Sequence, residues 1–77
     1  MIKFEIGEIY EFKGFARALN FGKDRLWVYK NTLIFIVDIN NIKTSSDQII
    51  KCLLMAHNKI YEMYVIREND ERWEKLT

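Results

Sequence analysis

The sequence contains no proline, a single cysteine and a single histidine. One cysteine, Cys52, excludes an intrachain disulfide and a cysteine-based metal site, and a lone thiol is typical of a reducing compartment. One histidine, His57, excludes a histidine-rich metal centre. We therefore expect no metal, no cofactor and a cytoplasmic location.

Long apolar runs are also missing. The longest, Leu33–Val37, has five residues, whereas a helix that crosses a membrane needs about 20. Charges interrupt the first residues, Met1–Glu5, at once, so they do not resemble a secretory signal. The sequence therefore predicts a protein with no membrane partner.

Glycine is scarce, and the three glycines, Gly7, Gly14 and Gly22, all lie in the first third of the chain. Large apolar side chains are abundant instead: 49% of the residues are apolar and 14% are aromatic. A domain of this length buries only roughly 60% of the surface that its unfolded chain exposes. Such a core allows the 77 residues to fold as one small domain, residues 1–77, but not as two.

Runs rich in β-branched and aromatic residues predict a mainly β fold. Gly7 and Gly14 bracket the first run, and Lys30-Asn31 is expected to form a tight turn because Asn tolerates a positive φ. The segment 15–21 is ambiguous: Phe15, Ala16 and Leu19 are spaced for one helical turn, but the segment is too short to hold a helix alone, and a long hairpin-like loop is preferred. Strands are expected at residues 8–13, 25–29, 32–39 and 60–66.

Residues 45–58 fit two structures. A capping box at Ser45 and an apolar stripe favour a helix at about 45–57, which would give an α+β fold. Alternation and a turn at His57-Asn58 favour a β-hairpin, which we take as the simpler interpretation. After it, residues 68–76 are expected to form a short helical turn anchored by Trp73, which belongs either to the core or to an interface.

As an all-β chain, the sequence resembles small SH3-like barrels. The resemblance rests on Gly7–Phe12 as a first strand, a long basic loop, central strands at 33–39 and 49–66, and a closing turn at 70–76. The aromatic-rich, proline-free style is similar to short proteins encoded by bacteriophages and mobile elements. The resemblance implies a small SH3-like barrel with a C-terminal helical turn.

Side chains that could support catalysis are present but poorly spaced. Cys52 and His57 are five residues apart, a spacing that brings two side chains together neither on a helix nor within one strand. Three carboxylates near the start, those of Glu5, Glu8 and Glu11, are expected to face solvent. No glycine-rich phosphate-binding motif matches. The sequence thus predicts no catalytic residues and no enzyme.

The stretch 12–30 interleaves cations with aromatic side chains. Nucleic-acid-binding surfaces combine cations for the phosphates with aromatic faces for the bases. Two interpretations stay open: a nucleic-acid-binding surface, or aromatic residues that fill the core while the cations keep its outside soluble. The cations are Lys13, Arg17, Lys23, Arg25 and Lys30, and the aromatic residues are Phe12, Phe15, Phe21, Trp27 and Tyr29.

The apolar excess favours a protein partner. Strands that are apolar on both faces are hard to cover in a small domain, and exposed patches or free sheet edges mark interfaces, homodimers included. The residues expected in such a patch are Ile34, Ile36, Leu53, Met55, Tyr61 and Met63.

The sequence therefore predicts a small binding module that acts through protein–protein interaction. Aromatic side chains are frequent anchors of such interfaces. The phage-type resemblance implies an inhibitor or modulator of a host protein, and binding of nucleic acid through residues 12–30 is the alternative. The four expected anchors are Trp27, Tyr29, Tyr61 and Tyr64.

Overall fold

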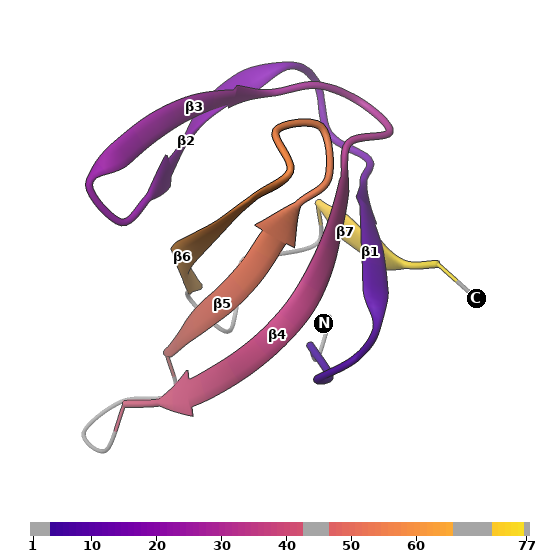
Figure 1. Cartoon of the computed structure of the whole chain (residues 1–77). Coiled ribbons are helices and arrows are strands. Elements are labelled where there is room, and N and C mark those ends of the chain that lie inside the picture. Colours follow the sequence, from indigo (N-terminus) through magenta and orange to yellow (C-terminus); the bar gives the residue numbers. More distant parts are fainter. Residues whose placement is uncertain (1–3, 43–46, 66–71, 77) are drawn as a thin grey trace.

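A computed structural model describes residues 4–42, 47–65 and 72–76 and confirms a mainly β fold. Seven strands and no helix occur within these ranges (Figure 1). The strands are β1 (Ile9–Phe12), β2 (Arg17–Phe21), β3 (Asp24–Val28), β4 (Leu33–Asn41), β5 (Gln48–Leu54), β6 (Lys59–Val65) and β7 (Trp73–Lys75).

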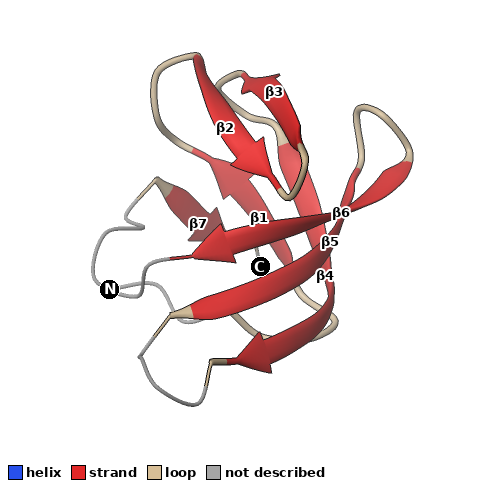
Figure 2. Ribbon diagram, turned by 90° about the vertical axis from the view of Figure 1, so that its left-hand side faces the viewer, coloured by secondary structure: helices blue, strands red, loops and turns tan. Residues whose placement is uncertain are grey.

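The strands form two antiparallel sheets. One has five strands in the order β6-β5-β4-β1-β7, and the other is the β2–β3 hairpin. The hairpin stands apart from the larger sheet, with β6 the nearest sheet strand below it (Figure 2). The expected closed barrel is wrong for the described strands, because no hydrogen-bonded ladder joins the two sheets. Both edges of β4 are taken by β1 and β5, so β3 pairs with β2 alone.

The expected helical turn near the C-terminus is also wrong for the residues described there. Trp73–Lys75 is a strand that pairs antiparallel with β1. A strand at a sheet edge has backbone N–H and C=O groups without hydrogen-bond partners. Strand β7 provides hydrogen-bond partners for these groups of β1. Residues 68–71, the first part of the predicted turn, lie outside the described ranges.

The segment 15–21 is not a loop throughout. Arg17–Phe21 forms β2, in which Phe21 is buried and Leu19 packs against the core. Gly22 follows with a φ of 63°, a value that glycine adopts without steric cost. The helix expected as an alternative at about 45–57 is wrong as well, since Gln48–Leu54 is strand β5.

The hairpin interpretation of the second half is confirmed. Strands β5 and β6 pair antiparallel from Gln48↔Val65 to Leu54↔Lys59. The turn between them has four residues instead of two, and the Asn58 N–H donates to the Met55 carbonyl oxygen at 3.2 Å. Asn58 has a φ of 51°, which Asn adopts more easily than most residues.

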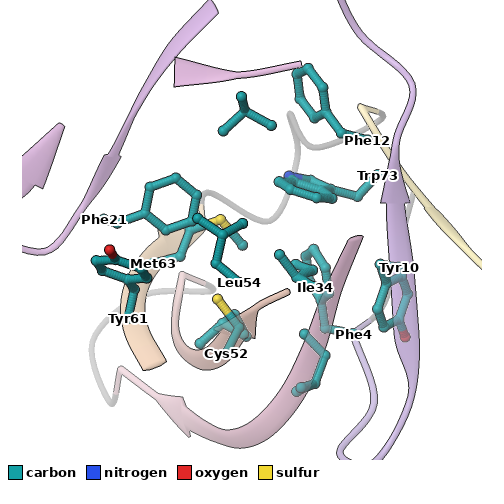
Figure 3. Close-up of a cluster of buried hydrophobic side chains, with 13 residues drawn as sticks. Phe4, Tyr10, Phe12, Phe21, Ile34, Cys52, Leu54, Tyr61, Met63 and Trp73 are labelled. Carbon is teal, nitrogen blue, oxygen red and sulfur yellow. The ribbon is translucent and has the colours of Figure 1, made fainter. Parts of the chain in front are cut away.

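The core lies between the hairpin and the inner face of the larger sheet (Figure 3). Trp73 is fully buried, so it belongs to the core and not to an interface. Its ring lies 5.0 Å from that of Phe12 at an interplanar angle of 63°, an edge-to-face geometry that aromatic pairs prefer. The buried apolar residues are Phe4, Tyr10, Phe12, Phe21, Val28, Ile34, Ile36, Ile50, Cys52, Leu54, Tyr61, Met63 and Trp73.

A β-bulge in β4 changes which residues face the core. The register with β5 shifts between Ile36 and Asp38, so Val37 is an extra residue and is 37% exposed. An extra residue inverts the alternation beyond it. Ile39 therefore packs against the core, although simple alternation places it on the same face as Phe35.

The turn between β3 and β4 confirms the role expected for Asn31. The Thr32 N–H donates to the Tyr29 carbonyl oxygen at 3.1 Å, and the Asn31 N–H donates to the Phe12 carbonyl oxygen at 2.8 Å. Asn31 has a φ of 72°. The turn thus ties the end of β1 to the start of β4.

The positive φ at position 31 leads to a prediction. A β-branched side chain is strained there, at a cost of about 1–3 kcal/mol. Asn31→Val should therefore lower the free energy of unfolding by about 1–3 kcal/mol, while Asn31→Gly should stay within about 0.5 kcal/mol of the parent. Urea denaturation measures both, and equal stability of the two variants would contradict the prediction.

Candidate binding surface on the β2–β3 hairpin

Alternation along β3 separates an inner from an outer face of the hairpin. Leu26 packs against the core and Val28 is fully buried, whereas Arg25 and Trp27 are exposed. Across the hairpin, Ala18 is the partner of Trp27 and Asn20 that of Arg25. Side chains of directly opposite residues share a face. The outer face therefore carries Trp27 beside a small residue.

Exposed aromatic residues accumulate on this segment. Phe15 is 95%, Trp27 62% and Tyr29 61% exposed. Three exposed aromatic side chains within one short segment are unusual, because residues of this type dominate cores and interfaces. We call the exposed side chains of this segment the hairpin surface: Phe15, Arg17, Lys23, Arg25, Trp27, Tyr29 and Lys30.

Four cations lie on the hairpin surface, at its base, face and tip. Arg17 begins β2 opposite the buried Val28, so it lies at the base on the inner face and not beside Trp27. Lys23 lies in the tip turn and Lys30 follows Tyr29. None of the four forms an ion pair within residues 4–42, 47–65 and 72–76. Arg25 donates one hydrogen bond, from Nη1 to the Asn20 side-chain oxygen at 3.2 Å. Their charges are therefore available to a ligand.

Lys13, the fifth predicted cation, has a different environment. Its Nζ lies 2.6 Å from Glu11 Oε1 and 3.9 Å from Glu74 Oε2. Glu11 and Glu74 are partners across β1 and β7, a like-charge pair that Lys13 offsets. The hydrogen bond to Glu11 raises the pKa of Lys13. Its charge is neutralised within the protein.

The aromatic residues of the stretch 12–30 divide between the two interpretations. Phe12 and Phe21 are buried, as a core interpretation requires. The other three lie on the hairpin surface. Phe15 was not among the expected anchors, although its place between Gly14 and Arg17, outside any apolar alternation, is a sequence signal of exposure.

The two tyrosines predicted on β6 have different environments. Tyr61 is only 9% exposed and packs against Phe21 with ring centroids 5.8 Å apart. Tyr64 is 54% exposed, and its hydroxyl donates to Asp47 Oδ2 at 2.5 Å. This hydrogen bond to a carboxylate raises the pKa of Tyr64.

An open groove of about 570 Å³ lies beside Tyr64. The hairpin tip forms one wall, which includes Lys23, and outward side chains of β5 and β6 form the other, among them Lys51 and Ile60. The groove thus brings together two expected anchors and one expected cation, while Trp27 and Tyr29 do not line it.

The apolar patch expected on the central strands is mostly core. Ile34, Ile36, Tyr61 and Met63 are buried, because the hairpin covers the inner face of the larger sheet. On the outer face, a cross-strand row runs through Ile9, Phe35, Leu53 and Ile60. Of this row, Ile60 is 52% exposed.

Among the described residues, Cys52 and His57 lie in different environments. Cys52 is fully buried, and burial raises the pKa of its thiol to about 12. His57 is exposed in the β5–β6 turn, with Nδ1 3.3 Å from the Tyr61 hydroxyl. No cluster of His, Cys, Asp and Glu able to hold a metal occurs among the described side chains. Within the same part of the chain, no helix is long and apolar enough to cross a membrane.

Comparison with known protein families, curated proteins and solved structures gives no match to this chain.

Proposed function

We propose that this protein is a non-catalytic binding module that contacts an acidic macromolecule through the hairpin surface. The carrying observation is the coincidence of three exposed aromatic side chains with four cations that have no ion pair among the described residues. Aromatic and Arg side chains dominate the binding energy of macromolecular interfaces. Only one acidic residue, Asp24, lies between Phe12 and Lys30.

Both functions predicted from the sequence use this surface. Trp27 and Tyr29 are anchors of the predicted protein interface, and Arg17, Lys23, Arg25 and Lys30 are cations of the predicted nucleic-acid site. An inhibitor or modulator of a host protein would need a target with an acidic face, which the four cations would steer toward the hairpin. The cytoplasmic location and the homodimer stay predictions.

A partner-capture experiment tests the proposed function. The tagged protein, the double variant Trp27→Ala/Tyr29→Ala and the control Tyr64→Ala are incubated with host lysate, with and without nuclease. We expect the double variant to lose its partner at least about 30-fold relative to the parent, because a hot-spot residue contributes about 2 kcal/mol or more. The Tyr64→Ala control should retain it.

Stability separates a binding effect from a folding effect in these variants. All three substituted side chains are more than half exposed, so each substitution should change the free energy of unfolding by about 0.5 kcal/mol or less. Undiminished capture by the double variant would contradict the proposal. Loss of the partner in Tyr64→Ala alone would move the site to the groove.

A further inference from the structure

We propose that the hairpin surface binds single-stranded nucleic acid, an inference that rests on the proposed function above. Lys23, Arg25 and Lys30 are exposed and have no ion pair among the described residues. Arg17 has no ion pair there either, but it pairs with the buried Val28 and so lies on the other face of the hairpin from Trp27. A phosphate backbone presents its charges at regular intervals and can contact the first three cations.

The indole ring of Trp27 is accessible to a ligand. Its cross-strand partner is Ala18, whose methyl group is too small to cover an indole. Trp27 is accordingly 62% exposed, and Tyr29, two residues on, is 61% exposed. A base needs only one accessible aromatic face in order to stack. These two rings provide it without any rearrangement of the hairpin.

The spacing of charge and ring fits an extended strand. Arg25 and Trp27 are successive outward residues of β3, so their Cα atoms lie about 7 Å apart. The rise per nucleotide of a stacked strand is only about 3.4 Å, so a stacked strand does not match this spacing. A single strand with its bases unstacked is more extended, and it can place a phosphate at Arg25 and a base on Trp27.

The same observations favour a single strand over the other acidic ligands. In a duplex the base faces are covered by their neighbours in the stack, so Trp27 and Tyr29 would have nothing to stack on. A protein partner would need pockets to receive three protruding aromatic side chains. Single-stranded nucleic acid supplies flat rings and negative charges together.

Fluorescence anisotropy tests the inference directly. The probes are labelled single strands of DNA and of RNA, about 16 nucleotides long to match the upper site size of small binding domains, and the corresponding DNA duplex. Poly-aspartate serves as an acidic polymer without bases. The full chain is titrated against each probe over a series of salt concentrations.

We expect both single strands to bind more tightly than the duplex and than poly-aspartate. Three contacting cations give a slope of about −2.1 in a plot of log affinity against log salt concentration. Trp27→Ala should weaken binding about 5- to 140-fold and leave this slope unchanged, because the side chain carries no charge. A preference for RNA or for DNA would identify the natural ligand.

A pair of charge variants provides a matched control. Arg25→Glu/Lys30→Glu should reduce the slope to about −0.7. Lys59→Glu/Lys75→Glu changes the net charge by the same amount on exposed positions of the larger sheet. If binding uses the hairpin surface, only the first variant shows the reduced slope.

Three outcomes would overturn the inference: no binding of either single strand, equal affinity for the duplex, or affinity unchanged by Trp27→Ala. Each leaves the proposed function to be judged separately by partner capture. A nuclease-resistant protein that the parent retains and Trp27→Ala/Tyr29→Ala loses would uphold the binding module and identify an acidic protein as its partner. Failure of both experiments would reject both proposals.

Discussion

Trp73→Ala is expected to lower the free energy of unfolding by about 3–5 kcal/mol, the cost of truncating a buried aromatic residue. Trp73 is fully buried and packs on Phe12, its partner across β1 and β7. A chain of this length has a total stability of roughly 4–12 kcal/mol. The substitution should therefore remove a large fraction of the stability and detach β7 from β1. Urea denaturation followed by circular dichroism measures the loss.

The conservative variant Trp73→Phe serves as the control. The indole Nε1 is buried without a hydrogen-bond partner among the described residues, and an unpartnered buried donor carries a desolvation penalty. Phenylalanine removes that donor while it keeps an aromatic ring against Phe12. We expect a loss of about 1 kcal/mol. If this variant were as unstable as Trp73→Ala, the packing argument would fail and the N–H group would matter instead.

Raising the pH from 9 to 12 should destabilise the protein through Cys52. Burial raises the pKa of this thiol from 9.0 to about 12, so the unfolded chain loses the proton near pH 9 while the folded chain keeps it. The stability contribution is complete below pH 9 and is lost as the pH rises toward 12. The loss amounts to about 1.4 kcal/mol per pH unit and about 4 kcal/mol in total.

The variant Cys52→Ala isolates this effect. At pH 7 it should be about 1 kcal/mol less stable than the parent because of the small cavity. It has no thiol at position 52, so it should not show the loss of stability that deprotonation of this thiol causes at alkaline pH. Plotted against pH, the free energies of unfolding of the two proteins should cross near pH 10. Tyr10, whose pKa burial also raises, is present in both proteins and cancels in the comparison. Parallel curves over the whole range would disprove the assignment to Cys52.

Local patterns predicted the strands whose side chains alternate. The β5–β6 hairpin and the turn at Asn31 follow from periodicity and from the conformational tolerance of Asn. Alternation within 25–29 also places Arg25 and Trp27 on one side of β3, with Tyr29 just beyond its end. The exposure of these side chains could therefore be predicted from the sequence.

Features that depend on distant partners were not predictable in this way. Strand β7 is too short to show a period, and it forms because β1 offers an edge. The same pairing adds Glu74, at 3.9 Å, to the environment of Lys13, whose nearer partner at 2.6 Å is its sequence neighbour Glu11. The bulge at Val37 cannot be recognised from the amino-acid composition. This bulge is the reason that Ile39 faces the core. The separation of the hairpin from the larger sheet likewise depends on distant partners, because β1 and β5 occupy both edges of β4 and β3 pairs only with β2.

The pairing of β1 with β7 also constrains the order of folding. Strand β1 lies between β4 and β7 in the larger sheet, although β7 is the last strand in the sequence. Closing so long a loop is entropically costly, and folds rich in such distant contacts form slowly. The hairpins β2–β3 and β5–β6 join neighbouring segments and can form early. During synthesis on a ribosome, these hairpins would therefore precede the pairing of β1 with β7, and the burial of Phe12 under Trp73 would follow them.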